Sequence, residues 1–127
     1  MGKGYRQGRL GEEIRKIISR MLLRDLKDPR FDGRMISVSA VDVTRDNSYA
    51  TCYITVLDMA GNEEKADMQK NEIIDGFNNA RGMIRKEIGS KIKLRHVPEL
   101  IFKIDESLEY GRRIDEVIRS LGKEDEQ

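Results

Sequence analysis

The sequence contains one cysteine and one histidine among its 127 residues. With Cys52 alone, the chain has neither a disulfide framework nor a thiolate cluster for a metal. No apolar run resembles a signal peptide or approaches the length that spans a membrane. We therefore expect a reduced, soluble, cytoplasmic protein with no membrane partner.

Residue types that carry catalysis are equally scarce. His96 has no carboxylate near it in the sequence to orient its ring, and Cys52 falls in the inward register of an expected strand. The sequence has no phosphate-binding P-loop, dinucleotide fingerprint or cluster of metal ligands. Acidic pairs such as Glu63-Glu64 are adjacent on a helix and point apart. These observations favour a binding protein that is not an enzyme, with no cofactor and no small-molecule substrate.

Positive and negative charges nearly balance, at a net charge of +1, but they are segregated along the chain. Residues 1–34 contain ten Lys/Arg against five Asp/Glu, and residues 80–103 contain seven against two. Residues 58–76 contain two against six, and residues 105–127 contain four against eight. If the two basic segments fold together, they form one electropositive surface of the kind that binds nucleic acid.

The first regular element expected is an amphipathic helix from about Leu10. It should end before Pro29, because proline disfavours helical geometry in the residue that precedes it. Its apolar positions recur at helical spacing and are Leu10, Ile14, Ile17, Ile18, Met21, Leu22 and Leu26. Since this stripe lacks aromatic residues and is needed for the core, we expect the helix to pack inside the domain rather than on a membrane.

Residues 35–57 alternate as a β-hairpin around a polar turn at residues 44–48. The small aliphatic side chains should face the helices; these are Ile36, Val38 and Ala40, then Ala50, Cys52, Ile54 and Val56. Tyr49 and Tyr53 then lie on the outer face, where aromatic residues stack on bases in some RNA-binding modules. The simpler interpretation is that both tyrosines are ordinary half-exposed strand residues.

Two helices are predicted to meet at a bend over residues 78–82, Asn-Asn-Ala-Arg-Gly. The first should begin after an Asn62 cap, and the second should run to about Ile92. Asparagine tolerates the left-handed conformation and Gly82 adopts positive φ without steric cost, which favours a break there. A helix that restarts beyond the bend presents unpaired N–H groups and a positive dipole end, which together bind anions. Alternatively, Gly82 only lets the helices pack closely, and the basic residues are a solvated face.

A third strand is expected from Leu100 to Ile104, followed by a last helix that Ser107 caps. The order helix, strand, strand, helix, helix, strand, helix predicts an α+β domain with a three-stranded mixed sheet and helices packed on one face. We expect one domain over residues 1–121 and a charged flexible tail over residues 122–127. A bend flanked by basic residues in this frame is typical of a KH domain, whose interhelical loop clamps a nucleic-acid backbone. Ala80-Arg81-Gly82 replaces the usual Gly-X-X-Gly, which favours recognition of backbone or shape over reading of bases.

Six segments have the order and spacing of one known family. They are Asp28-Pro29-Arg30, Val38 to Asp46, Ala50 to Ile54, Ala80 to Arg85, Leu94 to Phe102 and Asp105 to Ile114. Through them the chain resembles the ribosome-binding factor A family over roughly residues 5–121. The resemblance implies a type II KH-like fold with an Ala-X-Gly kink, matched by Ala80 and Gly82. It also implies a factor that binds the immature small (30S) ribosomal subunit and its 16S rRNA. Such a factor aids late maturation and processing of the 16S rRNA 5′ end, notably in the cold, and then leaves.

The expected RNA-binding residues combine the basic N-terminus with the kink and the helix after it. They are Lys3, Arg6, Arg9, Ala80, Arg81, Gly82, Arg85, Lys86, Lys91, Lys93 and Arg95. Their cations would neutralise phosphates, which gives salt-sensitive affinity without reading of bases. We expect a monomer. Two other functions stay open: a generic KH-like protein that binds single-stranded RNA, and an adaptor that docks a protein on the acidic helix at residues 63–75.

Overall fold

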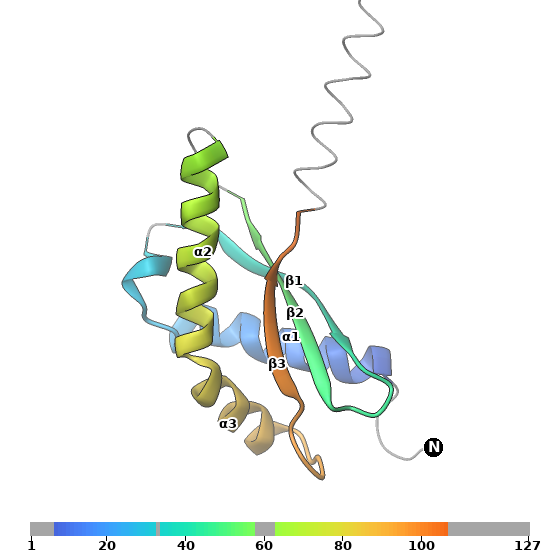
Figure 1. Ribbon diagram of the computed structural model, residues 1–127. Helices are drawn as coiled ribbons and strands as arrows, with labels where there is room; N and C mark the ends of the chain where they lie inside the picture. The colour runs from blue at the N-terminus through green and yellow to red at the C-terminus, as the bar shows by residue number, and fades with distance from the viewer. Residues whose placement is uncertain (1–6, 33, 58–62, 107–127) are drawn as a thin grey trace, which may run out of the picture.

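A three-stranded mixed sheet organises the computed structural model, which describes residues 7–32, 34–57 and 63–106 (Figure 1). The strands β1 (Ile36–Val43) and β2 (Tyr49–Val56) are antiparallel, and β3 (Glu99–Ile104) pairs in parallel with β2. The helices are α1 (Gln7–Arg24), the short 3₁₀ helix η1 (Pro29–Phe31), α2 (Glu63–Asn79) and α3 (Arg81–Lys91). The predicted α+β class and mixed sheet are therefore confirmed. The Asn62 cap, the helix after Ser107 and the tail lie outside the described residues.

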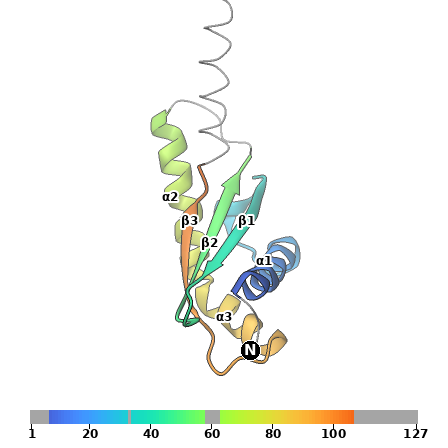
Figure 2. The same ribbon diagram turned by 90° about the vertical axis from the view of Figure 1, so that its right-hand side faces the viewer.

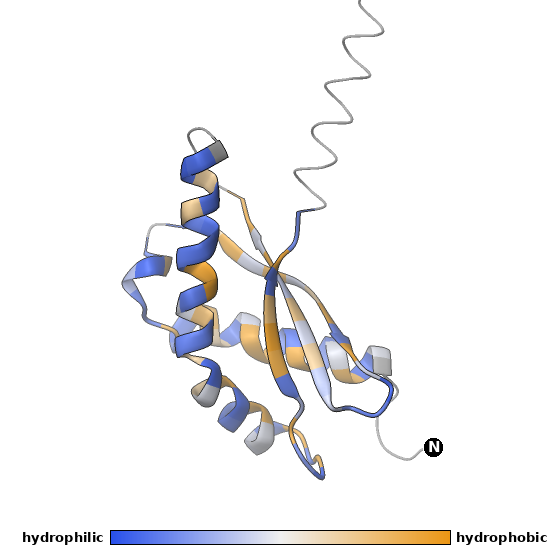
Figure 3. Cartoon of the chain, in the orientation of Figure 1, coloured by the Kyte–Doolittle hydropathy of each residue, from blue (hydrophilic) through white to orange (hydrophobic). Residues whose placement is uncertain are grey.

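The core lies between one face of the sheet and the helices. Helix α1 packs against β1, and α2 packs against β3 (Figure 2). The apolar stripe predicted for the first helix is buried apart from Leu22, which is half-buried against the core, and Figure 3 shows that stripe in orange. The contact with β1 is close, since a Cβ added at Gly11 would run into the carbonyl oxygen of Val41. Every second residue of β2, from Ala50 to Val56, is buried, as the alternation predicts.

A β-bulge at Ser39 makes the expectation for Ala40 wrong. The pairing moves from Val38 opposite Ile54 to Ala40 opposite Tyr53, so Ser39 is an extra residue in β1. Beyond an extra residue the alternation of side chains reverses. Ala40 is consequently exposed, and Val41 enters the core in its place. The Ser39 hydroxyl group lies 3.3 Å from the Tyr53 carbonyl oxygen and 2.6 Å from an Asp105 carboxylate oxygen, which holds the bulge.

The turn between β1 and β2 is held by side-chain oxygens. The amide N–H groups of Ser48 and Tyr49 donate to the Thr44 hydroxyl oxygen at 3.1 and 3.0 Å. Asn47 adopts a left-handed φ of 62°, which asparagine tolerates. Hydrogen bonds from Ser48, and then from Thr44, hold the pKa of Asp46 below its ordinary value.

The helix break was predicted at the right place but with the wrong backbone conformation. Helix α2 ends at Asn79 and α3 begins at Arg81, so Ala80 alone separates them. Ala80 has φ −89° and ψ 0°, and its N–H group is 3.1 Å from the carbonyl oxygens of both Gly76 and Phe77. The kink is therefore a local change in ψ, and neither the asparagines nor Gly82 adopts a left-handed φ.

Aromatic packing holds this kink against the rest of the domain. The Phe77 ring lies 4.9 Å from that of Phe31 in η1 and 5.2 Å from that of Phe102 in β3. Asp28 caps η1 by accepting a hydrogen bond from the Arg30 amide at 2.9 Å. The residues on either side of the kink are thus presented on a rigid support.

Candidate nucleic-acid interface

The start of α3 is open to solvent and uncapped. No side chain caps it at Ala80, whose carbonyl oxygen accepts the first intrahelical hydrogen bond, from the Ile84 amide at 2.9 Å. Gly82 is exposed, and a Cβ added there would meet no atom within 4 Å. The interpretation that Gly82 allows close helix packing is therefore wrong. Nothing in the described part of the chain occupies the space above this residue.

Arg81 is only partly available at the kink. Its Nη2 donates to the side-chain oxygen of Asn78. Its Nε is buried and has no hydrogen-bond partner among the described residues. The guanidinium group is therefore held in place beside the uncapped helix start, with one donor unsatisfied.

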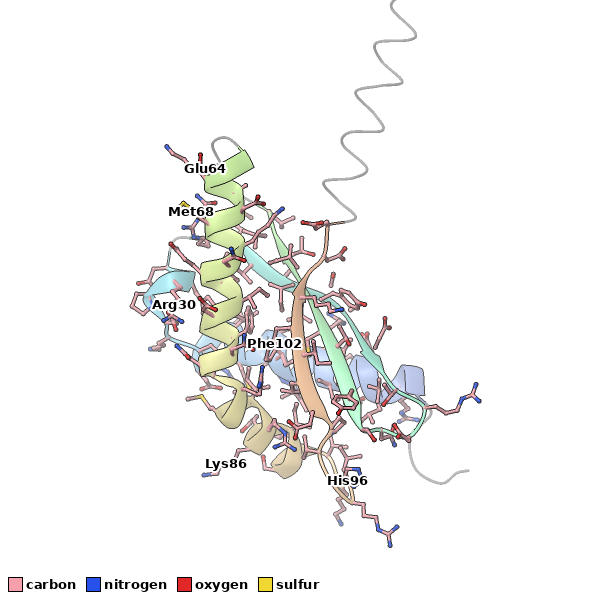
Figure 4. All side chains as sticks on the ribbon, viewed as in Figure 1. Arg30, Glu64, Met68, Lys86, His96 and Phe102 are labelled. Carbon is pink, nitrogen blue, oxygen red and sulfur yellow. The ribbon has the colours of Figure 1, made fainter. Side chains whose placement is uncertain are left out.

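Exposed cations extend from α3 into the loop that follows it. Lys86, Lys93 and Arg95 are exposed, and within residues 7–32, 34–57 and 63–106 none of them has an ion-pair partner. Figure 4 shows Lys86 projecting away from the ribbon. Lys91 lies 3.9 Å from Glu87 one turn earlier, in an exposed pair worth little energetically. These side chains can take anionic partners without first breaking a strong internal contact.

Arg85, predicted as an RNA contact, makes several contacts within the domain. Its Nη2 and Nε donate to the carbonyl oxygens of Val97 and Pro98 at 2.8 and 3.3 Å. A carboxylate oxygen of Glu99 lies 3.5 Å from the same guanidinium group. Arg85 therefore ties α3 to the segment that leads into β3.

The two basic segments of the sequence meet where α1 lies beside α3. A groove of about 270 Å³ between these helices is lined by Arg20 and Arg24 from one helix and Lys91 from the other. Asp25 and Glu87 also line it, so the groove is polar and only partly basic. Arg20 and Arg24 were not among the predicted site residues, although they stand out as charges on the outer face of the first helix. Arg9 is exposed near the start of α1, and Lys3 and Arg6 lie outside the described residues.

The tyrosines of the sheet and the Cys52 thiol lie away from this surface. Tyr49 is half-exposed on the open face of the sheet, as expected, and Tyr53 is partly buried there. Burial raises the pKa of the Cys52 thiol to about 12, so this group is an inert part of the core. The described residues include no group of side chains that could hold a metal ion, and none of their helices could span a membrane.

Comparison with known proteins places these features in a family. The family model described as ribosome-binding factor A matches residues 6–118. The chain belongs to the ribosome-binding factor A family. A member of the family from Caldanaerobacter subterraneus is 43% identical over 121 residues, which are 95% of this chain and 93% of the relative.

Known structures of the family share the fold. A solution NMR structure from Thermotoga maritima is 30% identical at a TM-score of 0.65, covering 84% of this chain and 93% of that one. A homology model of the Thermus thermophilus factor, fitted into a cryo-electron-microscopy map of its 30S complex, is 16% identical. It has a TM-score of 0.59 and covers 79% of this chain and 96% of that one. The fold is therefore the KH-like α+β fold of the family, as the resemblance implied.

Proposed function

We propose that this protein binds the immature small (30S) ribosomal subunit by laying the kink and α3 against its 16S rRNA. The observation that carries the proposal is the coincidence of an uncapped helix start, an open glycine and exposed cations. Lys86 lies on α3, and Lys93 and Arg95 lie in the loop that follows its last residue; all three lack ion-pair partners among the described residues. Membership of the family and the 30S complex of the Thermus thermophilus relative support the ribosome as the partner.

In this proposal the cations neutralise phosphates, and Gly82 lets the RNA backbone approach the start of α3 closely. Contacts of this kind orient a protein and supply affinity but read no sequence. Specificity then comes from the shape of a folded rRNA junction. Arg20 and Arg24 extend the same surface across the groove to α1. Lys3, Arg6 and Arg9 are included in the proposal as further phosphate contacts.

The role that follows is that of a non-enzymatic, monomeric, cytoplasmic assembly factor. It would assist late maturation of the subunit, including processing of the 16S rRNA 5′ end, and would matter most in the cold. One domain over residues 1–121 would carry this function, with residues 122–127 as a charged tail. It would leave when assembly of the subunit is complete.

Salt-dependent co-sedimentation with purified immature 30S particles tests the proposed surface. Each phosphate contact contributes about 0.7–0.9 to the slope of log K against log salt concentration. The triple variant Lys86→Gln, Lys93→Gln, Arg95→Gln should therefore lower that slope by about 2–3. The control triple Lys65→Gln, Arg45→Gln, Lys103→Gln removes the same charge from exposed positions on α2, the hairpin turn and β3. It should leave most of the slope in place.

Gly82→Ala tests the close approach separately from charge. Because a Cβ at Gly82 meets nothing in the protein, this variant should be as stable as the wild type or slightly more stable. Subunit binding should nevertheless weaken if an RNA backbone lies against this position. Gly8→Ala is the control, since a Cβ at Gly8 on α1 also meets no atom within 4 Å.

The two other functions predict different results in these assays. A generic binder of single-stranded RNA would bind short oligonucleotides as tightly as the subunit. An adaptor that docks a protein on the acidic face of α2, where Figure 4 labels Glu64 and Met68, would retain its partner after nuclease treatment. Equal salt slopes for the two triple variants would contradict the surface proposed here.

A further inference from the structure

A pocket of about 280 Å³ lies beside the kink, between the end of α1 and η1 on one side and the α2–α3 break on the other. Apolar and polar side chains share its lining: Leu26, Phe31 and Met83 among the former, and Asp25, Asp28 and Asn79 among the latter. This volume is just below the range of about 300–1,000 Å³ usual for small-molecule sites. A single planar ring system would therefore fit better than a larger ligand.

The polar part of this pocket offers hydrogen-bond acceptors. Asp25 follows the last residue of α1 and is exposed, and its carboxylate has no hydrogen-bond or ion-pair partner among the described residues. A carboxylate at the C-terminal end of a helix opposes the helix dipole, so α1 itself gains no stability from Asp25, which also lines the groove between α1 and α3. The Oδ1 atom of Asp28 caps η1. Its Oδ2 atom faces α2 at Gly76, where it would lie 3.4 Å from a Cβ built on that glycine. Ionised carboxylates accept hydrogen bonds and donate none.

Cations stand around these acceptors. The Arg30 Nε lies 3.8 Å from the Asp28 Oδ1. When the Asn79 side-chain amide is oriented with its oxygen toward Arg30, that oxygen accepts a hydrogen bond from Arg30 Nη1 at 2.8 Å. Lys27 also lines the pocket, and Figure 4 shows Arg30 beside α2. A cationic side chain from a protein partner would meet these two positive charges. A nucleotide suits the pattern better. Its base can donate hydrogen bonds to the carboxylates inside the pocket, and its phosphate can pair with Lys27 and Arg30 around it.

We infer that this pocket receives one unpaired guanine base from the RNA that binds the kink. The inference rests on the function proposed above and deepens it. Guanine presents N1–H and N2–H as adjacent donors, which match the two oxygens of one carboxylate as a guanidinium group does. Phe31 and Met83 supply apolar walls, and unpaired RNA bases stack on aromatic side chains such as that of Phe31. Met83 is 54% exposed, and its flexible thioether can adjust over a planar ring.

NMR titration of the whole protein with guanosine monophosphate, and with inosine monophosphate as the analogue lacking the exocyclic amino group, tests this assignment. The Met83 methyl group and the Asn79 side-chain amide should shift with the guanine nucleotide. Binding should be about tenfold weaker for the inosine nucleotide and for the Asp25→Asn variant, because a bidentate contact is lost. Asp42→Asn, an equal change at an exposed position of β1, should bind like the wild type.

Co-sedimentation of the same protein with 30S particles separates this inference from the proposed function. Absence of pocket shifts in a protein that still co-sediments would overturn the base pocket and leave subunit binding intact. Shifts caused by an arginine-rich peptide, but not by the guanine nucleotide, would also overturn it in favour of a protein ligand. Equal affinity of Asp25→Asn and Asp42→Asn for the guanine nucleotide would contradict the role given to Asp25.

Discussion

Replacement of Arg85 by glutamine should destabilise the domain, because this side chain supports the fold. A hydrogen bond from a charged donor is worth roughly 1.5–3 kcal/mol, and Arg85 makes one of 2.8 Å and a weaker one of 3.3 Å. Its ion pair with Glu99 joins side chains that are 35% and 58% exposed, so it adds only about 0–1 kcal/mol. Arg85→Gln should therefore lower the free energy of unfolding by about 2–3 kcal/mol.

Urea unfolding followed by circular dichroism at neutral pH measures this effect. The melting temperature should fall as well, by about 10 °C for a domain of this size. Lys86→Gln is the matched control, because Lys86 is the next residue, is exposed and has no partner among the described residues. It should change stability by no more than about 0.5 kcal/mol. If Arg85→Gln is as stable as Lys86→Gln but fails to bind the subunit, Arg85 is an RNA contact and the structural argument is wrong.

Three further predictions concern the fold. Gly11→Ala should lower the urea midpoint, because its Cβ would run into a carbonyl oxygen of β1, whereas Gly8→Ala on the same helix should not. Burial of the Cys52 thiol, with its pKa near 12, should protect it from iodoacetamide at pH 8 until urea unfolds the protein; rapid labelling of the native protein would argue against burial. Asp46 has a depressed pKa in the folded turn, so its stabilisation is present above the ordinary value of 3.8 and lost as the pH falls through the lower, folded value. The stability difference between wild type and Asp46→Ala should shrink over that range, and a pH-independent difference would refute the role of the ionised carboxylate.

Much of the fold follows from periodicity in the sequence. The stripe from Leu10 to Met21 and the alternation from Ala50 to Val56 each bury the side chains that their spacing predicts. The bulge at Ser39 could not be foreseen in the same way. The bulge is held by hydrogen bonds from Ser39 to the Tyr53 carbonyl group and to Asp105, which is distant in the sequence. It therefore depends on tertiary contacts that no local sequence pattern reveals.

The candidate site was predictable only as a distribution of charge. The basic segment after the kink indicates which residues gather there, but not which of them are already bound within the protein. Arg85 donates hydrogen bonds to the carbonyl groups of Val97 and Pro98, which lie beyond the end of α3. No local sequence pattern predicts these hydrogen bonds. The place of Arg24 opposite Lys91 likewise depends on how two distant helices pack.

A photo-crosslinking residue at position 86, in place of Lys86, tests most directly whether the surface at the kink touches RNA in the small subunit. Position 65 on α2 serves as the comparison site, since Lys65 is also exposed. Irradiation of the protein bound to immature 30S particles should attach position 86, and not position 65, to 16S rRNA. Crosslinks from position 86 to ribosomal proteins alone, or to rRNA equally from both positions, would contradict the interface described here.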